Sequence, residues 1–267
     1  MKNLAFCLEM LYRELPFARR LVAAKQDGVT AIEMWDWRDK NIPALRQQLQ
    51  TLEIRLLNMS GNRRFGMLDD AEEENFIREI RETAQVARTL DCPRLMLLVQ
   101  RLLQDDRAKP AAAGLSRREK VEQLIRSGRR AGEVGDEFGL EVVIEPLNDV
   151  LDHPGYFLNS AQLAFEVISE IGHPRVKLLY DVYHMAMMGE NIFRDLEQHI
   201  SLIGYIHLAD KPGRHEPGSG QLDFRGLLAL LQHLHYAGPI GFEFTPSDGD
   251  SHRAVTQVLR DFAAAAD

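Results

Sequence analysis

The 267-residue chain has few cysteines, no long hydrophobic run and no excess of basic residues. Its two cysteines, Cys7 and Cys92, lack the close spacing of metal ligands, which argues against a disulfide framework or a thiolate metal site. No run of about 18 apolar residues occurs, so no membrane span is expected. The first apolar stretch is interrupted by Glu9, which argues against a signal peptide. These absences predict a cytoplasmic protein without a membrane partner.

The charge balance is acidic. Aspartate and glutamate number 40 against 32 lysines and arginines, which gives a formal net charge of -8. Proteins that bind nucleic acid or anionic membranes carry clustered positive charge, and here only local basic pairs such as Arg129 and Arg130 occur, which we interpret as solvated helix faces. We therefore expect no nucleic-acid partner.

Eight short runs of apolar and β-branched residues alternate with longer segments of helical spacing. The predicted strands cover residues 4–8, 30–35, 54–59, 94–99, 141–146, 176–181, 203–208 and 240–245. Eight strand–helix units in roughly 250 residues predict an α/β protein whose residues 1–267 form a single (β/α)8 TIM barrel domain. An open doubly wound sheet is the competing architecture, but no GxGxxG motif follows the first strand.

Glycines and serines mark the ends of the predicted helices. The glycines expected to cap helices before the next strand are Gly28, Gly139, Gly172 and Gly238. Ser116 and the pair Asn159-Ser160 are predicted N-cap positions. The longest irregular segment, 101–116, follows the fourth predicted strand, so in a barrel it overlooks the active site and could serve as a lid.

Four consecutive predicted strands each end in a side chain that can bind a metal ion. These are Glu145, Asp181, His207 and Glu243. Active sites of such barrels lie at the carboxyl ends of the strands, so we expect the four side chains to converge. Three carboxylates buried together without a cation would be protonated or strongly destabilising, and a divalent ion removes that conflict. A set rich in oxygen with one imidazole favours Mn²⁺ or Mg²⁺, and less strongly Co²⁺ or Zn²⁺.

Taken alone, each of these residues has a structural explanation. Glu145 could cap the following helix, Asp181 could be the N-cap of a turn, and His207 could be a hydrogen-bonded core histidine. Glu243 is harder to explain, because phenylalanines flank it on both sides. Four such coincidences in successive units favour a common site.

The same segments resemble the xylose isomerase-like TIM barrels, and among them the hydroxypyruvate isomerases. The matching segments are LEMLYRELPF (8–17), IEPLN (144–148), PGYFLN (154–159), LYDVYHM (179–185), YIHLADKPGRHEPGSG (205–220) and GFEF (241–244). The resemblance covers the C-terminal half closely and the N-terminal half loosely. It implies that Glu145, Asp181, His207 and Glu243 bind the metal, and that Glu145 and Glu243 also exchange the roles of acid and base.

Three departures from that family concern the substrate. Hydroxypyruvate isomerases usually have glutamine at the position of His207, whereas the related ketose 3-epimerases have histidine. The segments NMSGNRRFG (58–66) and WDWRDKN (35–41) replace the loops that the family usually carries there. Trp35 and Trp37 either pack on the substrate or lie buried under the loop. The roles of loops 58–70 and 101–116 therefore stay open.

The implied reaction is the interconversion of an α-hydroxy aldehyde and ketone through an enediolate, which a divalent ion stabilises without an organic cofactor. The expected substrate is a small carbohydrate or hydroxy-keto acid, such as hydroxypyruvate or tartronate semialdehyde. The main alternative is a ketose 3-epimerase. A lyase or hydrolase of the same superfamily and a non-catalytic sugar-binding barrel are less favoured. A homo-oligomer is expected only by analogy with other barrels.

Four further residues are candidates for substrate binding: His184, Arg214, Glu216 and Glu33. His184 resembles the family's substrate-contacting histidine, and the alternative is that it orients Asp181. Arg214 lies on a loop rich in glycine and proline, where a guanidinium suits a carboxylate or oxyanion of the substrate; otherwise it is a solvated loop residue. Glu216 shares that loop, and Glu33 is a candidate polar wall of the pocket.

Overall fold

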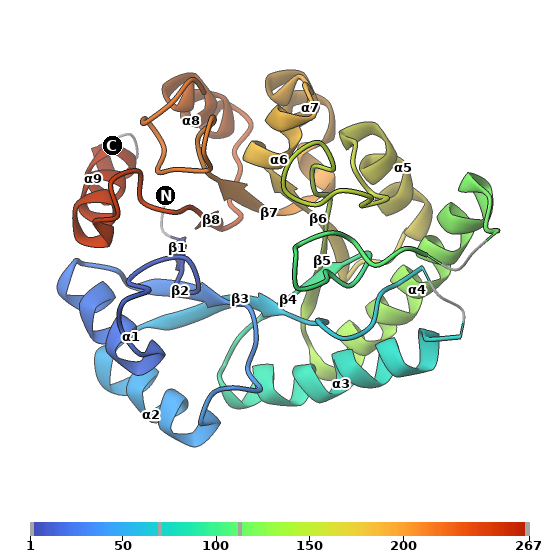
Figure 1. Cartoon of the computed structure of the whole chain (residues 1–267), viewed down its shortest axis with the longest axis horizontal. Helices are drawn as coiled ribbons and strands as arrows, with labels where there is room; N and C mark the ends of the chain where they lie inside the picture. Colours follow the sequence, from blue (N-terminus) through green and yellow to red (C-terminus); the bar gives the residue numbers. More distant parts are fainter. Residues whose placement is uncertain (1–2, 69–70, 112–113, 265–267) are drawn as a thin grey trace.

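The computed structural model describes residues 3–68, 71–111 and 114–264, and its strands form one closed parallel barrel (Figure 1). The strands are β1 (Leu4–Cys7), β2 (Ala31–Met34), β3 (Arg55–Ser60), β4 (Arg94–Leu98), β5 (Glu141–Glu145), β6 (Val176–Asp181), β7 (Ile203–Leu208) and β8 (Ile240–Phe242). Each pairs with its neighbours in sequence order, and β1 pairs with β8 to close the ring. The predicted single-domain (β/α)8 barrel and all eight predicted strands are confirmed.

The helices surround the strands on the outside (Figure 1). They are α1 (Phe17–Gln26), α2 (Ile42–Leu52), α3 (Glu73–Thr89), α4 (Arg117–Phe138), α5 (Ala161–Ile171), α6 (Val182–Met187), α7 (Ile192–His199), the 3₁₀ turn η1 (Ile200–Leu202), α8 (Phe224–His233) and α9 (Ser251–Ala264). One large apolar core fills the layer between helices and strands. None of the helices in the described ranges is both long and apolar enough to cross a bilayer.

A second, smaller apolar cluster is separate from the main core and consists of Met96, Val143, Leu179 and Tyr205. Neighbouring strand residues such as Val142 and Ile144 belong to the main core, so side-chain alternation directs the small cluster into the barrel. It forms an interior layer below the carboxyl ends of the strands, as packed barrels require.

The helix ends follow the predicted caps with one exception. Ser116 and Glu119 form a capping box at the start of α4, and Gly139 and Gly172 end α4 and α5 in the left-handed conformation. Gly238 does not cap a helix, because α8 ends five residues earlier, at position 233, and His235 (φ 52°) makes the left-handed turn. The sequence did not indicate that His235 would adopt the left-handed conformation, which glycine usually takes at this position of a helix end.

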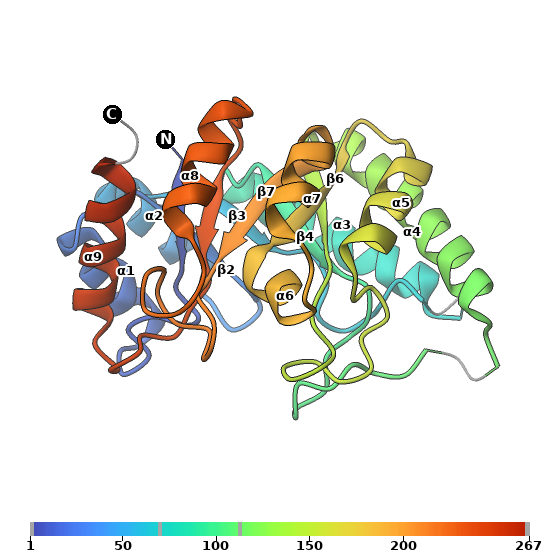
Figure 2. The same cartoon turned by 90° about the horizontal axis from the view of Figure 1, so that it is seen from above.

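The long loops after β4, β5 and β7 gather on one side of the barrel (Figure 2). The loop after β4 forms a small hairpin in which Leu102 bridges Ala108, and the amide of Ala108 donates to Pro154 in the loop after β5. Leu102 and Asp106 line the cavity at this end of the barrel. The predicted position of loop 101–116 over the site is therefore confirmed for its described part; its action as a lid stays a prediction.

Candidate metal centre

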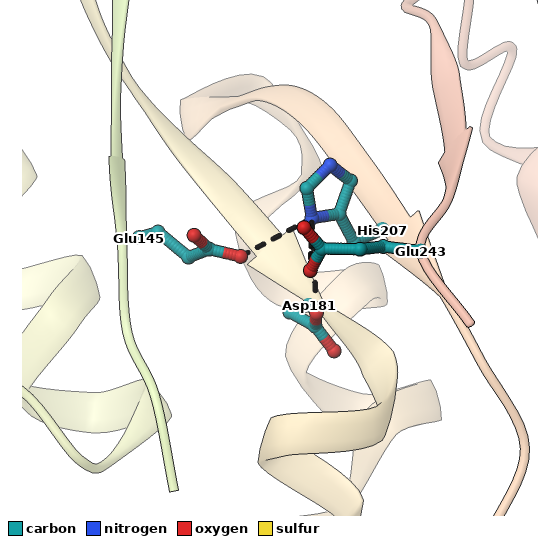
Figure 3. Close-up of side chains that lie close together, drawn as sticks. All are labelled: Glu145, Asp181, His207 and Glu243. Atoms are coloured by element: carbon teal, nitrogen blue, oxygen red, sulfur yellow. Dashed lines mark hydrogen bonds and ion pairs between the residues drawn. The ribbon is translucent and has the colours of Figure 1, made fainter. Parts of the chain in front are cut away.

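Glu145, Asp181, His207 and Glu243 converge at the carboxyl end of the barrel (Figure 3). One ligand atom from each lies within 4.8 Å of the others, and all four side chains are buried. His207 presents Nδ1 to the group, at 3.2 Å from Glu145 Oε1 and 3.7 Å from both Asp181 Oδ2 and Glu243 Oε2. The predicted convergence is thus found.

The interior apolar layer explains why these side chains meet. Glu145, Asp181 and His207 each follow a member of that layer by two positions along the strand, so they point to the same inner face one level higher. The strands are also in register, with Asp181 beside His207 and His207 beside Gly241. A Cβ atom at Gly241 would lie 2.7 Å from His207 Cδ2, so glycine leaves room for the imidazole.

The electrostatics of the group favour a positive charge at its centre. Burial raises the pKa of both Glu145 and Asp181. Burial alone would lower the pKa of His207, but the charges of Glu33 and Glu243 raise it well above its usual value. Three carboxylates around one imidazole therefore attract a cation, and the donor set can hold a metal ion.

Asp181 combines the two roles that its sequence position left open. It is the N-cap of α6, where its Oδ1 accepts the backbone N–H of His184 at 2.8 Å. Its Oδ2 faces His207. The cap fixes the carboxylate without occupying both oxygens, so one remains for the centre.

Glu33 lies behind His207. The Nε2–H of His207 donates to Glu33 Oε2 at 3.0 Å, and Glu33 is buried and does not line the cavity. This contact calls for a proton on Nε2, while Nδ1 faces the three carboxylates of Glu145, Asp181 and Glu243; a carboxylate behind an imidazole is the arrangement by which proteins orient metal-binding histidines. The structure therefore places Glu33 at the imidazole rather than at the pocket wall that its sequence position suggested.

A cavity of about 330 Å³ opens above the cluster. Glu145 and Glu243 line it, together with Trp35, Arg63 and His184. The Nδ1 atom of His184 accepts the backbone N–H of Asn148 at 3.3 Å, so Nε2 carries the proton. Burial lowers the pKa of His184 well below its usual value, and its Nε2 has no hydrogen-bond partner among the described residues. His184 is therefore a neutral imidazole whose Nε2–H lacks a hydrogen-bond acceptor in the described part of the chain, and its Nε2 lies 3.9 Å from Asp181 Oδ2.

Glu243 is held from several sides. The indole N–H of Trp35 donates to its Oε1 at 2.6 Å, and the Nη2 of Arg214 pairs with its Oε2. Burial would raise the pKa of Glu243, but Arg214 and His207 lower it overall. The thiol of Cys7 also lies 3.8 Å from Oε1, and burial keeps the pKa of that thiol high. The carboxylate is thus fixed in one orientation.

Arg214 owes its position to a buried aspartate that the sequence analysis did not identify. The carboxylate of Asp210 accepts five backbone N–H groups of the loop after β7. The donors are Lys211, Gly218, Gly220, Gln221 and Leu222. A Cβ at Gly220 would approach the carbonyl oxygen of Lys211 to 2.3 Å, so the tight turn requires glycine. The available signal was an aspartate directly after a strand and before a loop rich in proline and glycine.

Glu216 and Trp37 make contacts that join parts of the fold and lie away from the cavity. Both carboxylate oxygens of Glu216 accept hydrogen bonds from Ser247, at 2.8 Å from its N–H and 2.6 Å from its hydroxyl, which joins the loops after β7 and β8. Glu216 does not line the cavity, so the structure does not bring it to the other predicted substrate-binding residues. The indole of Trp37 donates to Thr83 of α3 at 3.1 Å, whereas Trp35 belongs to the cavity.

Comparison with known proteins gives the chain its relatives. A model of the family described as xylose isomerase-like TIM barrel matches residues 21–262. Hydroxypyruvate isomerase of Escherichia coli is 28% identical over 247 residues, which are 90% of this chain and 92% of that protein. 2-Oxo-tetronate isomerase of Cupriavidus necator is 30% identical and covers 94% of this chain and 95% of its own length.

Solved structures share the whole fold. A protein described as AP endonuclease, family 2, from Brucella melitensis has a TM-score of 0.84 at 25% identity and covers 99% of both chains. D-Allulose 3-epimerase from Methylomonas sp. in complex with D-allulose has a TM-score of 0.80 at 18% identity, over 98% of this chain and 96% of that one. The IolI protein with a bound zinc atom has a TM-score of 0.79 at 16% identity, over 98% and 97%.

Proposed function

The chain belongs to the xylose isomerase-like TIM barrel family, and we propose that it is a metal-dependent isomerase of a small α-hydroxy carbonyl acid, of the kind that interconverts hydroxypyruvate and tartronate semialdehyde. One observation carries this proposal: Glu145 and Glu243 approach the same buried cluster from opposite sides and line one small cavity (Figure 3). Relatives along nine-tenths of the chain are named isomerases of hydroxypyruvate and of 2-oxo-tetronate, which supports the reaction class.

The four clustered residues fit a divalent cation. We propose Glu145, Asp181, His207 and Glu243 as its ligands and Mn²⁺ or Mg²⁺ as the ion, because three carboxylates outnumber one imidazole and no thiolate takes part. When bound, the cation would acidify the C–H beside a substrate carbonyl and stabilise the enediolate. The zinc atom in the IolI structure supports metal binding on this fold. No organic cofactor belongs to the proposal.

Glu145 and Glu243 are the proposed proton-transfer groups. One carboxylate removes the proton from the carbon that bears the hydroxyl, and the other delivers a proton to the neighbouring carbon. The contacts of Glu243 with Trp35 and Arg214 keep its carboxylate aimed at the cavity, so little reorganisation is needed during the reaction. We propose the Nε2–H of His184, which has no hydrogen-bond partner among the described residues, as a donor to a substrate oxygen.

A ketose 3-epimerase is the second candidate. His207, at a position where such epimerases have histidine, and the fold shared with D-allulose 3-epimerase favour it. The two carboxylates would then act on opposite faces of one carbon. The reactions differ in the carbon that exchanges with solvent, and the lyase, hydrolase and sugar-binding alternatives require no such exchange.

Removing and restoring the metal tests the proposed function. Protein treated with EDTA should lose isomerase activity, and Mn²⁺ or Mg²⁺ should restore it more fully than Co²⁺ or Zn²⁺. In ²H₂O, hydroxypyruvate should gain deuterium at its hydroxymethyl carbon, as followed by NMR. Deuterium at C3 of a ketose, with none in hydroxypyruvate, would instead establish the epimerase. Full activity after chelation would contradict both.

Glu33→Gln should weaken metal binding about 10- to 100-fold, because the carboxylate orients the imidazole of His207. Isothermal titration with Mn²⁺ measures the effect directly. His207→Gln provides the matched background: once the imidazole is absent, adding Glu33→Gln should change the affinity little further. An equal loss in both backgrounds would mean that Glu33 acts on the fold and not through His207.

A cytoplasmic location and a homo-oligomeric state complete the proposal. The first is supported by the low cysteine content and the absence of a long apolar run in the sequence. The second is supported only by analogy with other barrels. Size-exclusion chromatography with light scattering would determine the oligomeric state.

A further inference from the structure

We propose that Arg63, on the loop between β3 and α3, binds the carboxylate of the substrate, and that the enzyme therefore acts on an acid rather than on a neutral sugar. The inference rests on the proposed function for the identity of the cavity as the substrate site. Arg63 lines this cavity with Glu145, Glu243 and His184. It lies in the segment 58–66 whose sequence departs from the family pattern.

A single indole connects Arg63 to the metal centre. The guanidinium carbon of Arg63 lies 5.5 Å from the ring centroid of Trp35, and the N–H of the same ring donates to Glu243. A cation held over an aromatic ring is attracted to the ring face, and the N–H groups of the guanidinium that point away from the ring can still donate. Arg63, Trp35 and Glu243 line one small cavity, so a molecule bound beside Glu243 shares that cavity with the guanidinium of Arg63.

The guanidinium of Arg63 has no carboxylate at ion-pair distance among the described residues, although its charge helps to lower the pKa of Asp36. Within residues 3–68, 71–111 and 114–264, no ion pair involves its guanidinium, whereas Arg38, Arg64 and Arg214 each pair with a glutamate. A guanidinium carries five N–H donors and binds a carboxylate through two of them at once. Arg214 also lines the cavity, but its Nη2 already pairs with Glu243, so Arg63 is the cavity arginine whose guanidinium forms no ion pair with the protein in the described ranges.

The loop that carries Arg63 is fixed in advance. Glu79 of α3, fully buried, accepts the backbone N–H groups of Arg63, Arg64 and Phe65 at 3.0 to 3.2 Å. Asn62 anchors the loop to β4, since its side chain accepts the N–H of Leu98 at 3.0 Å and donates to the carbonyl of Leu98 at 2.9 Å. A receptor held this way loses little entropy on binding.

The size of the cavity agrees with a short acid. Ligand sites of drug-sized molecules begin at roughly 300 Å³, and this one, at about 330 Å³, is at that lower limit. Glu145, Glu243 and Arg63 line this same small cavity, so its size suits a substrate of a few carbons. One arginine beside the two carboxylates therefore selects for one carboxylate on the substrate.

The test compares Arg63→Gln with Arg64→Gln on hydroxypyruvate and on dihydroxyacetone, in which a hydroxymethyl group replaces the carboxylate. Arg63→Gln should lower kcat/KM for hydroxypyruvate about 10- to 150-fold, the range expected for hydrogen bonds to a charged group. The same variant should keep kcat/KM for dihydroxyacetone within about twofold of the wild-type value, because Arg63 is proposed to contact only the carboxylate, which dihydroxyacetone lacks. Arg64 pairs with Glu79 and Glu82 and does not line the cavity, so Arg64→Gln should leave kcat/KM unchanged for both substrates.

Binding of D-glycerate and glycerol to the Mn²⁺-loaded protein separates this inference from the proposed reaction. If the wild type turns over neither carbonyl compound but D-glycerate binding still falls in Arg63→Gln alone, the carboxylate site stands and the isomerase proposal fails. If Arg63→Gln isomerises hydroxypyruvate as well as the wild type, Arg63 is not the receptor. An equal loss for acid and neutral compounds would also overturn the inference, because it would show a general structural role.

Discussion

Glu145→Gln and Glu243→Gln should each lower the turnover of hydroxypyruvate by about 10³-fold or more, because each removes a proposed proton-transfer group that is also a proposed metal ligand. Steady-state kinetics with Mn²⁺ in excess measures this loss. Glu141→Gln is the matched control. Glu141 begins β5, the strand that ends in Glu145, so it lies at the opposite end of the barrel, where it pairs with Arg94. Its replacement should leave turnover unchanged.

Metal-free Glu145→Gln should be more stable than the metal-free wild type. Burial raises the pKa of Glu145, so the fold disfavours its charged form, and an amide removes that cost. Thermal unfolding should therefore show a higher Tm for metal-free Glu145→Gln than for the metal-free wild type. Metal-free Glu243→Gln should show no such rise, because Arg214 and His207 stabilise the charge of Glu243. Added Mn²⁺ should raise the Tm of the wild type far more than that of either variant. Retained turnover in either variant would refute the two-carboxylate proposal.

Asp210→Ala should destabilise the protein by about 3 to 5 kcal/mol, the range for removing one partner of a buried charged network. Five backbone N–H groups would lose their shared acceptor, and the alanine side chain supplies none. Urea unfolding measures the free energy, and hydrogen exchange at Gly218, Gly220 and Leu222 localises the change. Asp210→Asn keeps one acceptor oxygen, so its free energy of unfolding should lie between those of the wild type and Asp210→Ala.

Asp223→Ala provides the comparison within the same region. Asp223 is the N-cap of α8 and accepts one amide, that of Gly226 at 2.9 Å, so its loss should cost only about 1 kcal/mol. Activity should follow the same order, since the loop that Asp210 organises carries Arg214 to Glu243. Equal destabilisation by the two alanine variants would show that the shared acceptor adds nothing beyond an ordinary helix cap.

The barrel and its central cluster were predictable because both depend on short-range rules. Alternation along a parallel strand fixes the inner face, and the pairing of β6 with β7 sets Asp181 beside His207. The sequence could therefore indicate the convergence of these side chains without any knowledge of the loops. It could not indicate which nitrogen of His207 faces the cluster, since that depends on Glu33, 174 residues away in the chain.

The loops were less predictable because their paths depend on contacts between distant segments. From the sequence, Glu216 is a candidate for substrate binding, and only the hydrogen bond from Ser247 shows that its carboxylate is used within the fold. Trp35 and Trp37 are equivalent in the sequence, and only contacts with Glu243 and with Thr83 distinguish them. The adjacent arginines 63 and 64 are also indistinguishable by type, yet one lines the cavity and the other pairs with Glu79 and Glu82.

The two anchoring carboxylates, Glu79 and Asp210, make each recognition loop a self-contained module. Each belongs to the same strand–helix unit as the loop it holds, and each binds backbone N–H groups, which every residue except proline supplies. The side chains of such a loop can change by mutation while its course is retained. The groups that line the cavity, such as Arg63 and Arg214, can therefore diverge one residue at a time during evolution without change in the buried cluster of Glu145, Asp181, His207 and Glu243.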